Sequence, residues 1–159
     1  MSARNMSRRG FSLIELVIVV VIIAIIAAIA IPRMSRGAAG ANDSALQADL
    51  RTLRNAIDLY AQEHGGTYPT LANINATPGA LTAYSDDQGT ISATKSATCI
   101  YGPYLRVLPT IPLGTEKGSS AFGASPATGT AWVYDVTTGG VTANTGTLTD
   151  AKGKQYSTY

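Results

Sequence analysis

The stretch that decides the fold is RRGFSLIELVIVVVIIAIIAAIAIP, residues 8–32. Every residue from position 16 to position 31 is apolar. The 21 residues at 11–31 would form a helix about 31 Å long, which matches a hydrocarbon core of about 30 Å. Because the stretch is apolar on every face, it predicts a membrane-spanning helix. Three arginines within the first ten residues favour a cytoplasmic N-terminus.

Three interpretations are open for this stretch. It is a plain membrane anchor, a secretory signal peptide cut after Ala28-Ile29-Ala30, or a retained helix that begins at a processing point at Gly10. The apolar run is long for a signal peptide, and it contains a carboxylate, Glu15. A carboxylate in an apolar span costs about 2.5–3.5 kcal/mol on insertion scales, and such residues usually have a partner and a role. Unless it is simply an interfacial acid, Glu15 favours the third interpretation.

The run Arg9-Gly10-Phe11-Ser12-Leu13-Ile14-Glu15 resembles the prepilin cleavage and methylation signature of type IV pilins and type II secretion pseudopilins. The resemblance implies that a membrane-embedded prepilin peptidase cuts between Gly10 and Phe11 and methylates the new amine of Phe11. Gly10 has no side chain, so a protease can approach its backbone closely. The resemblance also implies that, in a filament, Glu15 of one subunit neutralises the amine of its neighbour and sets the axial register.

A proline directly after the span, Pro32, predicts a bend or local melting of the helix. Helical character then resumes and runs to about His64, and Gly65-Gly66 ends the helix. One apolar stripe marks this part of the helix: Leu46, Leu50, Leu53, Ile57 and Tyr60. The stripe is too short for sustained heptads, so we expect it to pack on the protein's own sheet and not in a coiled coil.

The C-terminal half contains one clear hairpin pattern. Residues 130–136 and 141–144, with Gly139-Gly140 between them, predict two antiparallel strands whose shared face includes Trp132 and Tyr134. Residues 70–100 are turn-rich and predict a long connection with one short helix or strand. The tail from Thr145 is polar, and we expect it to be mobile.

This half is also similar to major pseudopilins in two places. Gly102-Pro103-Tyr104-Leu105 resembles the segment that enters the sheet in that family, and the hairpin resembles the terminal hairpin. An Asp-Pro-Trp-Gly-like run tends to follow in the family. Here Ile111-Pro112-Leu113-Gly114 takes its place and lacks both the Asp and the Trp.

Together these features predict an α+β, pilin-like lollipop. One long N-terminal helix, half transmembrane and half amphipathic, packs on a small antiparallel C-terminal sheet. We expect four parts: a prepilin leader at 1–10, a transmembrane and assembly helix at 11–32, the amphipathic half of the helix at 33–64, and a small β-rich globular head with a mobile tail at 65–159.

The remaining residues favour no catalytic or nucleic-acid chemistry. The net charge is +2, and the chain beyond the leader is near neutral, so we expect no nucleic-acid partner. Cys99 is the only cysteine, which excludes an intramolecular disulfide. His64, the only histidine, is expected to interact with the helix dipole. Nucleophile-elbow, Walker, Rossmann and zinc-protease motifs are absent from the sequence, so we expect neither catalytic residues nor an enzyme.

No cofactor is expected. Many major pseudopilins bind calcium in an acidic C-terminal loop, but this region has only Asp135 and Asp150, with main-chain carbonyls as further candidate ligands. Asp86 and Asp87 are expected to lie in a solvated turn and not at a metal.

The resemblance implies a structural subunit of a pilus-like filament, a type II secretion pseudopilin acting in protein secretion. The alternative is a type IV pilin of a surface fibre that serves adhesion, motility or DNA uptake. A second alternative is a secreted or anchored binding protein with a conventional signal sequence, whose mature chain would begin at Ile31 and not at Phe11.

The partners implied are prepilin peptidase, further copies of the chain, other pilins or pseudopilins, the inner-membrane assembly platform and membrane lipid. The implied location is the inner membrane, with a single pass and a cytoplasmic N-terminus before processing. After processing, the subunit enters a periplasmic pseudopilus or a cell-surface pilus.

Overall fold

The computed structural model describes residues 11–150 and 152–159, and for residues 31–39 it describes the backbone alone. The chain divides into two compact units, one up to Ala38 and one from Ala39 to Tyr159. The elements follow in the order α1 (Leu13–Glu63), α2 (Leu71–Ile74), β1 (Tyr84–Ser85), β2 (Ile91–Ser92), β3 (Phe122–Gly123), β4 (Trp132–Tyr134), β5 (Val141–Ala143) and a 3-10 helix, η1 (Tyr156–Thr158).

The first part of α1 is apolar on all sides. Its window Leu13–Ala30 has a mean hydropathy of 3.3, none of it is buried, and it is the one helix among the described residues that is long and apolar enough to cross a membrane. The large side chains from Leu13 to Ile29 are all exposed. In this structure the helix is unbroken at Pro32, and the bend expected there stays a prediction.

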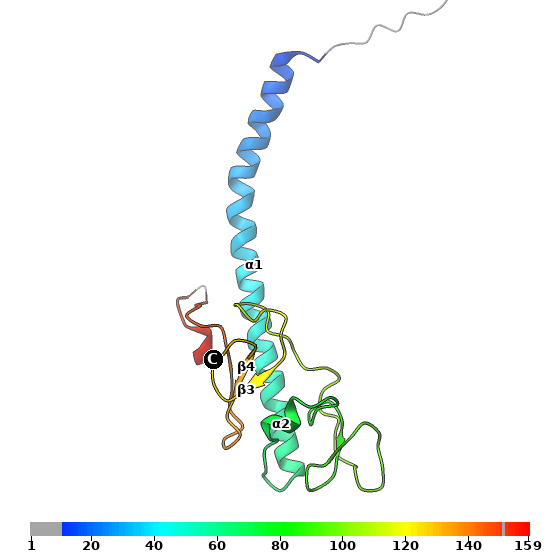
Figure 1. Ribbon diagram of the computed structural model, residues 1–159. Helices are drawn as coiled ribbons and strands as arrows, with labels where there is room; N and C mark the ends of the chain where they lie inside the picture. Colours follow the sequence, from blue (N-terminus) through cyan, green and yellow to red (C-terminus); the bar gives the residue numbers. More distant parts are fainter. Residues whose placement is uncertain (1–10, 151) are drawn as a thin grey trace, which may run out of the picture. The chain divides into compact units, whose positions relative to one another are not determined.

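The second part of α1 is the spine of the C-terminal unit. The predicted stripe is buried in full: Leu46, Leu50, Leu53, Ile57 and Tyr60 are at most 3% exposed. These residues share one hydrophobic core with Trp132, Tyr134 and Val141 of the sheet. Figure 1 shows β3 and β4 beside this part of α1. The expectation that the stripe packs on the protein's own sheet is therefore confirmed.

The helix ends where the glycine pair predicted its end. Gly65 and Gly66 both have positive φ, 62° and 86°. The N–H of Gly66 reaches back to the carbonyl of Ala61 at 2.7 Å, a bond typical of a helix closed by a left-handed turn. A side chain at either glycine would be strained, so this sequence turns the chain sharply into the head.

The predicted hairpin is confirmed. β4 and β5 pair antiparallel, with Trp132 opposite Ala143 and Tyr134 opposite Val141. The indole N–H of Trp132 donates to the carbonyl of Pro109 at 3.0 Å, and the Tyr134 hydroxyl donates to the carbonyl of Pro69 at 2.9 Å. Both aromatic side chains are thus buried with their polar atoms satisfied, as a stable core requires.

The sheet is mixed and not purely antiparallel. β3 joins β4 in parallel, which gives the three-stranded order β3-β4-β5. β3 has only two residues, too few to produce an alternating pattern in the sequence. The segment from Gly102 to Leu105 forms no strand; the N–H groups of Tyr104 and Leu105 both donate to the carbonyl of Leu81 instead. The connection at 70–100 holds α2 and the two-stranded β1-β2 sheet.

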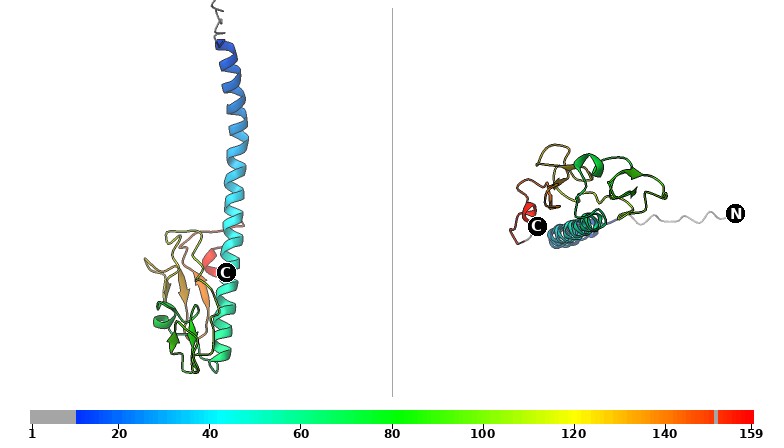
Figure 2. Two further views of the ribbon diagram at one scale, coloured as in Figure 1. Left: turned by 90° about the vertical axis from the view of Figure 1, so that its right-hand side faces the viewer. Right: turned by 90° about the horizontal axis from the view of Figure 1, so that it is seen from below.

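The tail from Thr145, expected to be mobile, packs on the helix. Tyr156 is 6% exposed and belongs to the hydrophobic core. Both views of Figure 2 place the C-terminal residues beside α1. The tail looks polar because its aromatic residues are tyrosines, and their hydroxyls find partners inside the fold. The sequence pattern could not show that these polar groups are satisfied.

Candidate processing and assembly site

The site predicted from the sequence lies at the start of α1. Gly10 lies outside the described residues, and Phe11 is 77% exposed directly before the helix. Glu15 lies in the first turn. One of its carboxylate oxygens, Oε2, accepts a hydrogen bond from the backbone N–H of Ser12 at 2.9 Å. The structure therefore gives Glu15 a partner within its own chain.

This bond explains why the helix begins where it does. The first N–H groups of a helix have no partner within the helix, and a carboxylate three residues after the cap residue satisfies one of them. Ser12-Leu13-Ile14-Glu15 has this spacing, a serine followed by an acid at the third position. Glu15 was predicted to be an assembly residue or an interfacial acid, and the role of Ser12 was not predicted. The capping-box pattern S-x-x-E was the signal that reveals it.

The carboxylate also lies in the first turn of α1, beside backbone N–H groups that have no partner within the helix. An amine created on Phe11 by cleavage would stand four residues before Glu15 in the same chain. Such a site needs no catalytic residue of its own. After cleavage, the chemistry open to it would be charge pairing between the acid and an amine, either of the same chain or of a neighbour.

The apolar surface that follows is suited to lipid or to other helices. Residues such as Leu16, Val20 and Ile23 are more than half exposed, and none of the window Leu13–Ala30 is buried within the chain. Water would hydrate this surface at a large cost in free energy, so an apolar environment must cover it. The side chain of Pro32, the expected bend, is outside the described side chains.

His64 has a structural role. The bond between its Nδ1 and the carbonyl of Tyr60 is 2.7 Å long, and Nε2 lies 3.1 Å from the hydroxyl of Ser85. Its ring stacks on that of Tyr60, with centroids 3.8 Å apart. A carbonyl of the last helical turn is thereby satisfied, which agrees with the expected interaction at the helix end. Ser85 is fully buried, so this serine and histidine pair offers a substrate no access.

Cys99 and the acidic turn lie elsewhere in the head. Cys99 is buried, with its sulfur 3.8 Å from the carbonyl of Thr90. Asp86 accepts hydrogen bonds from the backbone N–H groups of Gln88 and Thr90, at 3.0 and 2.7 Å. These bonds, that of Thr90 foremost, lower the pKa of Asp86. The predicted turn at Asp86 is confirmed.

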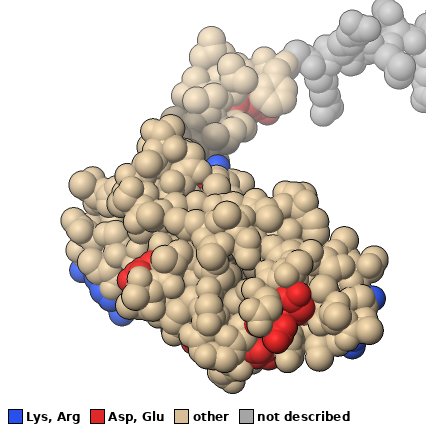
Figure 3. Space-filling model, turned by 60° about the horizontal axis from the view of Figure 1, so that its bottom comes forward, with Lys and Arg blue, Asp and Glu red and all other residues tan. Residues whose placement is uncertain are grey.

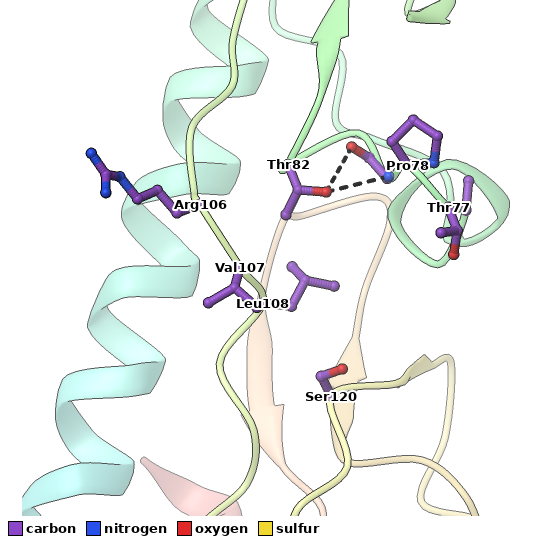
Figure 4. Close-up of a pocket in the computed structure, with 9 residues that line it drawn as sticks. Thr77, Pro78, Thr82, Arg106, Val107, Leu108 and Ser120 are labelled. Atoms are coloured by element: carbon purple, nitrogen blue, oxygen red, sulfur yellow. Dashed lines mark hydrogen bonds between the residues drawn. The ribbon is translucent and has the colours of Figure 1, made fainter. Parts of the chain in front are cut away.

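One hollow of the head has a largely uncharged lining. The hollow in Figure 4, about 260 Å³, is lined by residues of 76–82 and 106–108 and by Ser120. Arg106 is its only charged lining residue, and the Thr82 hydroxyl is bonded to Gly79. On the face in Figure 3, acidic and basic side chains form small separate groups on a largely uncharged surface.

Calcium would find a poor set of ligands in the C-terminal region. Asp135 accepts hydrogen bonds from the backbone of Thr137 and the hydroxyl of Thr138, both at 2.8 Å. Asp150 is likewise bonded to donors of its own turn. Among the described residues, no three His, Cys, Asp or Glu side chains gather where they could hold a metal. Calcium takes six to eight oxygens, several of them usually carboxylates, and this donor set does not fit it.

Comparison with known proteins identifies the N-terminal site. Residues 5–31 match the family model described as the prokaryotic N-terminal methylation motif. No match was found among curated proteins or among solved structures. The motif match covers Gly10, Phe11 and Glu15, and it lies on the exposed apolar helix. The chain therefore bears the N-terminal signature of type IV pilins and pseudopilins, which indicates a structural subunit and not an enzyme.

Proposed function

We propose that this chain is a pseudopilin of a type II secretion system, a filament subunit that acts in protein secretion. The observation that carries the proposal is the methylation motif at 5–31 on a helix whose first 18-residue window is exposed and apolar. That motif implies processing by prepilin peptidase and assembly with other pilins. Cleavage between Gly10 and Phe11 and methylation of Phe11 are the specific steps proposed.

The fold supports a subunit that polymerises through α1. The head packs on one side of the helix through the stripe from Leu46 to Tyr60, and the opposite side remains exposed at Ala45, Ala48 and Thr52. The apolar part before Ala30 has no cover within the chain. In the membrane this part is covered by lipid, and in a filament it is covered by neighbouring subunits. Extraction from lipid into a helical bundle changes the partners of the helix but not its apolar surroundings.

In the proposed filament, Glu15 pairs with the methylated amine of a neighbouring Phe11. Both groups are costly in an apolar environment when single, and pairing them fixes one axial arrangement of subunits. The proposed location is the inner membrane, with the head outside the cytoplasm and the leader inside it. The assembly platform of the membrane is the proposed partner for extraction.

Assignment to secretion, and not to a surface fibre, is supported by the C-terminal half. The sequence of the hairpin β4-β5 resembles the terminal hairpin of major pseudopilins, and the single Cys99 excludes a disulfide-framed loop. The test is to produce the chain with a prepilin peptidase and a secretion assembly platform. If deletion of the gene for this chain abolishes secretion and the chain restores it, the result supports the assignment as a pseudopilin. Filaments sheared from the surface of the native cells, with secretion unaffected by deletion, would assign a type IV pilin.

A further inference from the structure

The C-terminal turn is built around the carboxylate of Asp150. Its Oδ1 accepts the backbone N–H groups of Lys152 and Lys154, both at 2.8 Å. Its Oδ2 accepts the hydroxyl of Tyr159. The N–H of Asp150 donates in turn to the carbonyl of Lys154 at 2.8 Å. Both carboxylate oxygens thus have donors from the protein, and the turn is closed by them.

Two lysines line the same hollow as this carboxylate. The ammonium of Lys154 lies 4.1 Å from the centre of the Tyr159 ring, a cation–π contact. A hollow of about 490 Å³ beside the turn has Asp43 and Asp150 in its lining, but also Lys152 and Lys154. The two acidic residues of this lining are matched in number by two lysines. A divalent cation would have to displace the tyrosine hydroxyl and approach two lysines.

Two further contacts attach the tail to α1. Tyr156, buried in the core, donates its hydroxyl to Asp43 near the start of the C-terminal unit. Arg54 donates to the main-chain oxygen of Tyr159 and, at 2.7 Å, to the carbonyl of Val141 in β5. The guanidinium of Arg54 therefore links α1 to both β5 and the tail. Arg54 suits this role because its planar group offers several donors in fixed directions.

We infer that residues 145–150 and 152–159 are held on the helix by a metal-independent clasp of Asp150, Lys154 and Tyr159, with Tyr156 and Arg54 as its attachments to α1. The donors of the clasp occupy the carboxylate oxygens that would bind the ion in a calcium-binding loop. The clasp gives the carboxylate its partners and fixes the end of the chain on the spine. The clasp lies within the head and is independent of the kind of filament that the subunit forms.

The test uses the full chain in detergent, with thermal unfolding of the head followed by the fluorescence of Trp132. This tryptophan is the only one in the chain and is fully buried in the head core, so it reports that unit alone. Wild type, Tyr159→Phe and Lys154→Met are melted in EGTA, in magnesium, and in about 5 mM calcium, which exceeds the dissociation constants of extracellular calcium modules. Tyr68→Phe is the matched control, because Tyr68 packs on the core but its hydroxyl has no hydrogen bond to the described residues.

The wild-type midpoint should be the same in all three solutions. Tyr159→Phe should lower it by about 2–5 °C in each, since one charge-assisted hydrogen bond is lost. Lys154→Met should lower the midpoint by less than Tyr159→Phe does, and Tyr68→Phe should leave it unchanged. A wild-type midpoint raised by calcium and not by magnesium would overturn the inference. So would calcium rescue of Tyr159→Phe, or a Tyr159→Phe midpoint equal to that of the control.

Discussion

Glu15 and Ser12 are joined within one chain: the carboxylate of Glu15 accepts the backbone N–H of Ser12 at 2.9 Å. The acid proposed to pair with a neighbouring subunit thus already caps its own helix. Two roles, capping and charge pairing, fall on one side chain. They are separable, because an amide can accept a hydrogen bond but cannot neutralise an amine.

Glu15→Gln keeps an acceptor for Ser12 and removes the charge, whereas Glu15→Val removes both. We expect both variants to insert into the membrane at least as well as wild type, since Glu15→Val removes a cost of about 2.5–3.5 kcal/mol and Glu15→Gln removes the charge but keeps a polar group. Filament yield should fall sharply in both. The measurement compares membrane-bound subunit with sheared or cross-linked filament. Wild-type filament yield in Glu15→Gln would refute charge pairing and leave Glu15 as a capping residue.

Gly10 should tolerate only small side chains. Gly10→Val should block maturation because the β-branched side chain keeps the protease from the backbone, and mass spectrometry should find the ten-residue leader still attached. Gly10→Ala, which adds a single methyl group, is the matched control and should be processed at least in part. Normal cutting of Gly10→Val would count against processing by a prepilin peptidase.

Trp132 should be essential to the head. It is fully buried and its indole N–H is bonded to Pro109, so Trp132→Ala should lower the free energy of unfolding by about 3–5 kcal/mol. Val136 lies beyond the end of β4 and is 44% exposed, so Val136→Ala should change the free energy of unfolding by less than about 1 kcal/mol. Urea unfolding of residues 39–159, which contain the whole buried core, measures both by circular dichroism. Equal midpoints for the two variants would place Trp132 outside the core.

The head should lose stability in acid. Three aspartates have their pKa lowered from 3.8, each chiefly by one hydrogen bond: Asp86 by the Thr90 backbone, Asp135 by the Thr137 backbone and Asp150 by the Tyr159 hydroxyl. A lowered folded-state pKa gives stability that is present above the unfolded pKa and lost as the pH falls through the folded one. Burial raises the pKa of Asp49, which has the opposite sign.

With three lowered groups against one raised group, the unfolding free energy should be level near neutrality and fall below about pH 4. Asp135→Asn combined with Asp150→Asn should flatten this fall, because the amides keep the turns but do not titrate. Chemical unfolding at a series of pH values measures the slope. If the double variant shows the same slope as wild type, these carboxylates do not govern the acid response.

The fold was largely predictable because its strongest signals are local. Four local patterns each predict one feature of the fold: the apolar run, the stripe from Leu46 to Tyr60, the glycine pair at 65–66 and the alternation around Trp132. β3 was not predicted because a strand of two residues is too short to show an alternating pattern. The packed tail was missed because Tyr156 and Tyr159 look polar until their distant partners, Asp43 among them, are known.

The site was predictable for a different reason. Gly10, Phe11 and Glu15 form a motif whose spacing is recognisable without a structure, and the family match covers them. The bond from Ser12 to Glu15 was equally local, and the S-x-x-E spacing predicts it. Arg54 was not predictable as a junction, because Val141 and Tyr159 are far from it in sequence and meet only in the fold.

The mature N-terminus tests the central claim most directly. Subunit purified from membranes of the native cell is digested, and its N-terminal peptide is sequenced by mass spectrometry. Our account predicts that the chain begins at Phe11 and that its amine is methylated. A chain that begins at Ile31 would instead identify a conventional signal peptide, and one that retains residues 1–10 would identify a plain anchor; either result would contradict a prepilin-type subunit.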